Sequence, residues 1–362
     1  MSKARGLADL GNVYNNGALS NRNLIINGAM QVNQRNSDTA ITSGWACDRW
    51  NAADNQNGMT RQRNGGSYTK PAGFQNYLRY IVTTAKTKGA TDYSVIYQPI
   101  EAYNIQPLKW GTASAESATL SFVSRSNVTG TFGGSIQNHD GSMCYPFTYT
   151  IAAADTWEEQ VVVIDGPTSG TWNHDNGRGV TVNFGMGVGS TYSRPAGSWT
   201  TDYTFTATGA ADITGTLNNY LAVTGIQLEV GDTATPFEHR SYGQELALCQ
   251  RYYFTTWPTG TALGTNIVST RDLGVVMAGN SLKVVNGGLT LPVEMRATPS
   301  VSTRSPTGLT GKYYELASAL DFTYNYGVGL LVGTKYIGLD EYDAVATANR
   351  AGYTHLFCDA EL

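Results

Sequence analysis

Alternating apolar and polar residues dominate the chain between residues 23 and 240. The two-residue period recurs in LSF at residues 120–122, FTYTI at 147–151, VTVNFGM at 180–186 and IQLEV at 226–230. Successive side chains of a β-strand point to opposite faces, so these segments are predicted to be half-buried strands. Asn-Gly and Asp-Gly pairs between them supply tight turns, because glycine adopts positive φ without a Cβ clash. Spacing of this kind favours a two-sheet β-sandwich.

Residues 242–253 carry a helical pattern. Tyr242, Leu246, Cys249 and Tyr253 fall at i, i+4, i+7 and i+11, which places them in one apolar stripe. The stripe is interpreted either as the face of a lid packed on the sandwich or as a face on a threefold axis. Three helical turns are too few for the period to decide between them.

A second β-rich region is predicted after residue 253. LKV and LTLPV alternate on either side of NGG at residues 286–288, a pattern typical of a hairpin. The chain contains no tandem repeat of fixed period and no heptad array, so a long fibre shaft is not expected in it.

Charged residues are scarce, at 14% of the chain against about 25% in an average soluble protein. Glycine (41 residues) and tyrosine (22 residues) are abundant, which suits short strands and tight turns, so the predicted fold class is all-β. A net charge of -4 supplies no broad positive field, and nucleic-acid binding is not expected. No apolar run approaches the ~20 residues that span a bilayer, and the start of the chain lacks the apolar core of a secretory signal. We therefore expect no membrane insertion and synthesis in a cytoplasm.

Three segments together resemble the jelly-roll domain of bacteriophage tail-fibre and virion surface proteins. Residues 220–253, YLAVTGIQLEVGDTATPFEHRSYGQELALCQRYY, join a strand, a corner at Pro236 and a short helix. The other segments are NLIINGAMQVNQRN at residues 23–36, with Asp48-Arg49-Trp50 after it, and TWEEQVVVIDGPTSGTWNHDNGRGVTVNFGMGVG at residues 156–189. The resemblance covers roughly the first two thirds of the chain. LPVEMRATPSV at residues 291–301 and the terminal DAEL resemble, more loosely, the distal domain of such phage proteins.

The resemblance implies four parts. These are a virion-attachment segment at residues 1–22, a jelly-roll sandwich at 23–240, a linker helix at 241–253 and a distal β domain at 254–362. It also implies a homotrimer located in the virion, with residues 1–22 bound to another virion protein and a host-surface glycan as a further partner. Two other interpretations stay open: a capsid fibre, decoration or adaptor protein with no receptor role, and a glycan-degrading tailspike.

Motifs for catalysis are not found in the sequence. GMGVG at residues 185–189 lacks the spacing of a dinucleotide-binding loop and is interpreted as a strand of small residues that another segment approaches closely. Glu158 and Glu159 are adjacent on a predicted strand, so their side chains point to opposite faces and cannot form an acid–base pair. The chain is expected to be noncatalytic.

Metal sites are not indicated either. The four cysteines lie about a hundred residues apart, with no CxxC pair and no histidine at ligand spacing. The jelly roll also resembles carbohydrate-binding modules, many of which hold a structural calcium through carboxylates. Here Gln31 and Thr224-Gly225 stand where carboxylates are expected, and calcium prefers charged oxygen ligands. No metal and no cofactor is expected.

Sugar binding requires aromatic faces for the ring and amides or carboxylates for its hydroxyls. Predicted loops supply both kinds of side chain, and a further set of tyrosines lies in the predicted distal domain. The alternative for each aromatic residue is packing in the core or between subunits. The candidate glycan-binding residues are Trp172, Asn173, His174, Asp175, Trp199, Tyr313, Tyr314, Tyr324 and Tyr326.

Overall fold

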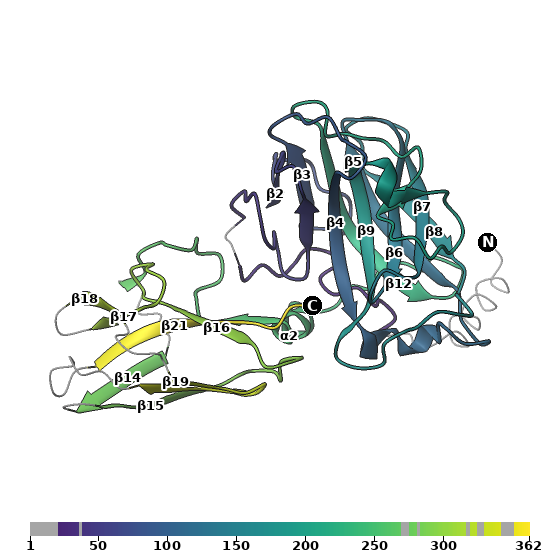
Figure 1. The fold of residues 1–362 in the computed structure, drawn as a ribbon. Helices are drawn as coiled ribbons and strands as arrows, with labels where there is room; N and C mark the ends of the chain where they lie inside the picture. The colour runs from purple at the N-terminus through teal and green to yellow at the C-terminus, as the bar shows by residue number, and fades with distance from the viewer. Residues whose placement is uncertain are drawn as a thin grey trace. The chain divides into compact units, whose positions relative to one another are not determined.

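The computed structural model describes residues 21–35, 38–268, 275–280, 283–315, 319–323, 329–341 and 351–362 (Figure 1). The chain divides into two compact units, Met1–Gln31 with Ala40–Ser241 and Leu362, and Val32–Thr39 with Tyr242–Glu361. Both units are built mainly of antiparallel strands, which confirms the predicted all-β class. No helix in the described part of the chain is long and apolar enough to cross a membrane.

The first unit is a jelly-roll sandwich of two five-stranded antiparallel sheets, as predicted (Figure 1). One sheet has the order β1 (Asn51–Asp54), β4 (Tyr93–Glu101), β9 (Arg178–Val188), β6 (Gly130–Asn138) and β7 (Cys144–Ile151). The other has the order β2 (Met59–Arg63), β3 (Leu78–Val82), β12 (Tyr220–Val230), β5 (Ala118–Ser126) and β8 (Glu158–Ile164).

Strand β9 shows how the alternating pattern builds the core. Val180, Val182, Phe184 and Met186 are fully buried in the space between the sheets. Phe184 lies 6.4 Å, centroid to centroid, from the indole of Trp50. These side chains, which are two residues apart in the sequence, therefore lie on the inner face of the sheet as predicted.

Residues 190–214 cover the outer face of β6 and β9. Ser135 Oγ and Gln137 Nε2 both donate to the backbone oxygen of Thr204, each at 2.7 Å. A Cβ on Gly185 would lie 2.8 Å from Thr206 Oγ1, and one on Gly187 would lie 2.2 Å from Asp212 Oδ1. The interpretation of GMGVG as a strand that another segment approaches closely is confirmed. This segment also contains η2 (Ser190–Tyr192) and the short parallel pair β10 (Ser193–Arg194) and β11 (Thr206–Ala207).

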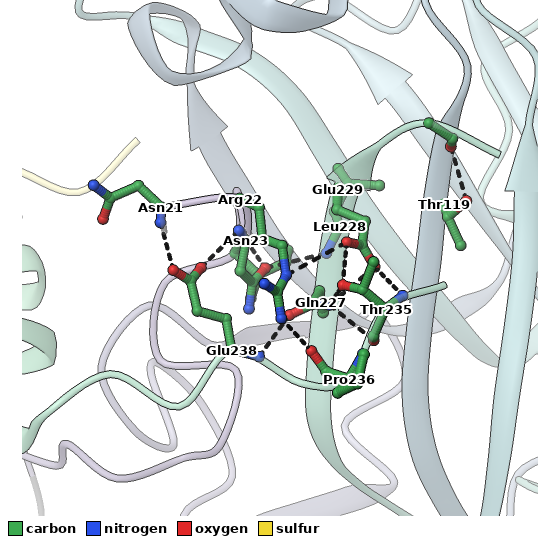
Figure 2. A network of polar contacts seen from close by, with 12 residues as sticks. Asn21, Arg22, Asn23, Thr119, Gln227, Leu228, Glu229, Thr235, Pro236 and Glu238 are labelled. Carbon is green, nitrogen blue, oxygen red and sulfur yellow. Dashed lines mark hydrogen bonds and ion pairs between the residues drawn. The ribbon is translucent and has the colours of Figure 1, made fainter. Parts of the chain in front are cut away.

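The corner after β12 is fixed by two glutamates (Figure 2). The carboxylate of Glu238 accepts the backbone N–H groups of Asn21 and Asn23, the latter at 2.9 Å. Glu229, with a side chain 3% exposed, accepts Thr235 N at 2.9 Å and Thr235 Oγ1 at 2.6 Å. Arg22 lies beside it, with Nε 3.7 Å from Glu229 Oε2. The predicted attachment segment 1–22 therefore ends in two residues that belong to this corner, and its first twenty residues lie outside the described residues.

Beyond Val32–Thr39, the second unit consists of α2 (Tyr242–Gln250) and a nine-stranded sheet. The order is β18, β17, β21, β14, β15, β20, β19, with β13 and β16 also paired to β21. The bounds are β13 Tyr253–Thr255, β14 Val275–Asn280, β15 Lys283–Thr290, β16 Ser300–Arg304, β17 Lys312–Glu315, β18 Leu320–Thr323, β19 Gly329–Val332, β20 Tyr336–Glu341 and β21 Ala351–Asp359.

Two predictions for this unit are wrong in detail. The NGG triplet at residues 286–288 lies inside β15, where the pairing with β20 shifts register between Val284 and Gly287, so it marks a bulge and not a hairpin. The helix ends at Gln250 and not at residue 253. Its stripe is broken as well, because Tyr242 is 49% exposed while Glu245 is buried. Periodicity over so few turns is a weak guide.

Candidate functional site

The candidate site lies in the sandwich unit and is built on η1 (Ala102–Leu108), a 3-10 helix that follows β4. The helix packs through every third residue, and its buried side chains are Ala102, Ile105 and Leu108. It ends at Lys109, whose φ of 53° lies in the left-handed region and whose backbone N–H donates to Gln106 O at 3.1 Å. The next residue, Trp110, is thereby directed back toward the sandwich core, where it is 3% exposed.

Three tryptophans from distant parts of the chain meet beside η1. The ring of Trp110 lies 5.1 Å from Trp172 and 5.3 Å from Trp199, at interplanar angles of 69° and 77°. Trp172 and Trp199 are 5.7 Å apart at 90°. These edge-to-face contacts suit the ring quadrupoles, which place the positive edge of one ring on the negative face of another. We call these residues the tryptophan cluster.

Each indole N–H of the tryptophan cluster donates to a backbone carbonyl. Trp110 Nε1 donates to Glu116 O at 2.8 Å, Trp172 Nε1 to Ser169 O at 3.1 Å and Trp199 Nε1 to Asp165 O at 2.7 Å. The rings are thereby held in fixed orientations. They can offer a ligand apolar surface, because their only donors are already engaged.

A pocket of about 250 Å³ opens between η1 and the loop that carries Trp172. Trp110 and Trp172 line it, but they are only 3% and 6% exposed and so contribute little surface to it. No carboxylate is among the described residues that line this pocket. The lining residues are Ile105, Gln106, Lys109, Trp110, Thr112, Trp172 and His174.

On the polar rim of the pocket, the side chains of Gln106 and His174 are hydrogen-bonded to each other. Gln106 Nε2 lies 3.1 Å from Ala102 O, and both amide atoms of Gln106 face His174 Nδ1, with Nε2 at 2.9 Å and Oε1 at 3.2 Å. If the amide donates both bonds, Nδ1 of His174 is the acceptor and its proton is on Nε2. His174 Nε2 is then a donor that a ligand in the pocket can use.

Lys109 and Thr112 complete the rim. Lys109 Nζ forms an ion pair with Glu116 Oε1 at 2.8 Å, with both side chains about half exposed (52% and 46%). Thr112 Oγ1 donates to Lys109 O at 2.7 Å. The rim of the pocket thus offers an ion-paired ammonium and a hydroxyl beside the amide and the imidazole.

The structure brings some of the predicted glycan residues together. Trp172 and His174 line the pocket, and Trp199 packs behind Trp172 and against Tyr145, 5.4 Å away. Burial, and secondarily the charge of Asp165, raise the pKa of Tyr145. Trp199 and Tyr145 lie outside the pocket lining and support the position of Trp172.

Asn173 and Asp175 hold the turn that carries His174. Asn173 Nδ2 donates to Arg178 O at 3.1 Å, and Asp175 Oδ1 accepts the backbone N–H of Gly177 at 2.8 Å. Their side chains position the loop, whereas sequence analysis placed them among the ligand-binding groups.

Of the tyrosines predicted in the second unit, the structure describes the side chain of Tyr314 alone. Tyr314 is 8% exposed, and its ring packs against Tyr353 at 5.7 Å and 66°. Tyr313 lies in β17, but its side chain is outside the described set, and Tyr324 and Tyr326 lie outside the described residues.

Sequence analysis missed the pocket residues from η1 and the segment directly after it, namely Gln106, Lys109, Trp110 and Thr112. The strand and helix periods do not detect a 3-10 helix. The signal available was the three-residue spacing of Ala102, Ile105 and Leu108, which is the period of that helix. In the part of the chain that the structure describes, no group of three or more His, Cys, Asp or Glu could hold a metal ion.

No protein-family model matches the chain, and no curated protein matches it in sequence. Solved structures with a similar fold include the enzymatically active domain of bacteriophage CBA120 tailspike protein 4, with a TM-score of 0.33, 13% identity, and 58% of this chain against 21% of that one. Two carbohydrate-binding modules are similar. TmCBM61 in complex with β-1,4-galactotriose has a TM-score of 0.30, 8% identity, and coverage of 58% and 99%. The family 11 module from Clostridium thermocellum, in complex with a mixed-linked tetrasaccharide, has a TM-score of 0.26, 13% identity, and coverage of 52% and 91%.

This chain thus matches about a fifth of the tailspike protein's length and nearly the whole length of the two modules. The likeness concerns the jelly-roll fold at low identity. Fold alone does not assign a ligand, and function therefore has to come from the pocket's own chemistry.

Proposed function

We propose that the chain is a noncatalytic surface protein of a bacteriophage virion, a tail fibre or spike, that attaches to a glycan on the host surface through the pocket beside η1. The observation that carries the binding role is the combination of apolar lining from Ile105, Trp110 and Trp172 with the polar rim of Gln106 and His174. A sugar ring presents C–H groups on its faces and hydroxyls at its edge; the apolar lining can contact the former and the rim can hydrogen-bond the latter.

The pocket's size limits what it can hold. Its volume of about 250 Å³ is below the roughly 300–1,000 Å³ typical of sites for drug-sized ligands. It therefore suits a single sugar residue, such as the end or a branch of a polysaccharide. One residue held by a small apolar surface and a few hydrogen bonds binds weakly.

Weak single sites fit a multivalent attachment protein. Linked sites raise the effective concentration of the second and third contacts, so three copies in a homotrimer gain affinity without any new contact. The virion role and the trimer are supported by the resemblance of residues 220–253, 23–36 and 156–189 to phage fibre proteins. In this proposal the protein is made in the host cytoplasm and joins another virion protein through its first residues.

The noncatalytic assignment is supported by the pocket's lining. Glycoside hydrolysis generally needs two carboxylates about 5–10 Å apart at the scissile bond. The described residues that line this pocket include no carboxylate, and Glu116, which lies next to it, is ion-paired to Lys109. A pocket that binds a glycan without cleaving it suits adsorption, because the glycan must stay intact while the particle is attached to it.

The experiment is a binding screen of the full-length protein against immobilised bacterial surface polysaccharides, followed by Gln106→Ala and His174→Ala. Both residues are exposed, so the variants should fold. Gln244→Ala, which removes an exposed glutamine of α2, is the matched control. We expect binding to fall several-fold in both pocket variants and to be unchanged in the control. If no polysaccharide binds the full-length protein, the proposal is wrong and a capsid fibre, decoration or adaptor role replaces it.

A further inference from the structure

Helix η1 presents a straight row of exposed side chains. A 3-10 helix has three residues per turn, so side chains at i and i+3 eclipse one another. Ala102, Ile105 and Leu108 form the buried row. The exposed row one position along consists of Tyr103, Gln106 and Lys109, all classed as exposed.

Two members of this row, Gln106 and Lys109, already line the pocket. The third, Tyr103, does not. At about 2.0 Å of rise per residue, Tyr103 lies about 6 Å along the helix axis from Gln106 and about 12 Å from Lys109. The former spacing is close to the length of one sugar residue in a linear glycan.

Tyr103 has the features of a platform. It is 57% exposed, and its ring makes no aromatic contact or hydrogen bond to any residue that the structure describes. Its backbone is nevertheless fixed, because Tyr103 N donates to Asp175 O at 3.0 Å and Ala102 N donates to Gly177 O at 2.8 Å. The loop that places His174 in the pocket therefore also anchors the start of η1.

The opposite end of the row carries an ion pair. Lys109 is paired to Glu116 at 2.8 Å, and the helix terminates there with a left-handed residue. A ligand that follows the row away from this ion pair runs along η1 toward Tyr103. An exposed tyrosine is ordinary by itself; its alignment with two pocket residues and its anchored backbone distinguish this one.

We propose that Tyr103 is a second subsite and that the ligand is a linear glycan of at least two residues, one in the pocket and the next stacked on the phenol ring. This inference rests on the proposed function of the pocket. It adds two points to that function. The ligand is a linear glycan and not a free monosaccharide, and the affinity depends on glycan length through Tyr103.

The test uses the full-length protein and three ladders: glucose, galactose and N-acetylglucosamine, each as the monosaccharide and as the linear β-1,4-linked dimer, trimer and tetramer. Binding is followed by tryptophan fluorescence, because Trp110 and Trp172 line the pocket. The variants are Tyr103→Ala and Tyr103→Phe, with Tyr242→Ala as a control at another exposed tyrosine, 49% exposed. The backbone N–H of residue 103 can donate its hydrogen bond in every variant, so we expect all variants to fold.

We expect the dimer to bind wild type about fivefold more tightly than the monosaccharide, as a stacking contact of about 1 kcal/mol would give. Tyr103→Ala should abolish that gain and leave monosaccharide affinity unchanged, whereas Tyr103→Phe and Tyr242→Ala should retain it. A gain that survives in Tyr103→Ala overturns the subsite but leaves the pocket's function standing. Binding of no ladder by the wild-type protein removes the pocket as a sugar site, and the subsite with it.

Discussion

A Cβ placed on Gly111 would lie 2.4 Å from Cδ1 of Trp172, so the indole packs directly on the glycine backbone. Gly111 also has a φ of +84°, a conformation that residues with a side chain rarely adopt. Gly170 has a φ of +92°, and a Cβ placed on it would lie 3.3 Å from Nε1 of the same ring. Two glycines thus allow Trp172 to reach the pocket floor.

Gly111→Ala is expected to displace Trp172 and weaken glycan binding while leaving every polar group of the rim in place. Backbone strain and the clash together should lower the free energy of unfolding by about 1–3 kcal/mol. The measurements are thermal denaturation and a glycan titration read by tryptophan fluorescence.

Gly197→Ala is the matched control for this substitution. Gly197 has a similar φ of +88°, but a Cβ there meets nothing within 4 Å. It carries the strain without the clash, so its ligand affinity should equal that of wild type. Equal affinities in Gly111→Ala and wild type would show that the position of Trp172 does not matter to binding.

The sequence predicted the sandwich more fully than the site. Alternation in residues 180–186 identified β9 and even its inward face, because a strand's period of two is local and one face is buried. The pocket is different. Gln106 and His174 are 68 positions apart, and the tryptophan cluster joins residues from three loops. A local sequence period cannot predict contacts between residues so far apart in the chain.

Glycine explains the main error in the second unit. The NGG triplet at residues 286–288 has turn composition, but glycine serves equally in a β-bulge, and the structure uses it there. The choice between the two depends on the partner strand β20, which lies about fifty residues downstream. The sequence in hand carries no local signal for that pairing.

Tyr149→Phe is expected to stabilise the protein at neutral pH. The Tyr149 ring packs on Phe122 and Phe132, and its hydroxyl is buried with no hydrogen-bond partner among the described residues. An unsatisfied buried hydroxyl costs about 1–3 kcal/mol, so its removal should raise the melting temperature by a few degrees. Tyr220→Phe is the control, because the Tyr220 hydroxyl accepts Arg125 Nε at 2.8 Å and its loss should destabilise.

The same substitution should flatten the loss of stability in alkali. Burial raises the pKa of Tyr149 above its ordinary value of 10.0, so above about pH 10 the unfolded chain releases this proton while the folded chain keeps it. The free energy of unfolding does not depend on the titration of this group below about pH 10, and it falls by about 1.4 kcal/mol per pH unit above that pH. Denaturant unfolding at pH 9 and pH 11 should show a smaller decline for Tyr149→Phe than for wild type. An identical decline would mean that this phenol ionises freely in the folded state.

Removal of residues 1–20 and substitution of Arg22 should have different effects. Residues 1–20 hold few large apolar side chains, so their deletion is expected to leave the melting temperature unchanged and to abolish incorporation into virions. Arg22→Ala removes the cation beside Glu229 and a donor to Pro236 O at 2.5 Å. Because Glu229 is 2% exposed, this should cost about 1–2 kcal/mol, less than a fully buried pair because Arg22 is partly solvated.

Arg22→Lys distinguishes charge from shape at this corner, since it keeps the cation and should recover part of the stability. Unfolding is measured on all three variants, and particle incorporation on the deletion. Normal incorporation of the chain that lacks residues 1–20 would contradict the attachment role.

The full-length protein is expected to be a homotrimer that blocks adsorption of the virus. Three linked pockets should compete with the particle far better than one, because avidity multiplies weak contacts. Light scattering should give three times the mass of a single chain, and pre-incubation of host cells with the protein should reduce adsorption. His174→Ala should keep the trimer and lose the competition, while Gln244→Ala should keep both. A trimer that never competes, even at high concentration, would point to a capsid fibre or adaptor with no receptor role, and antibody labelling of particles would then locate it.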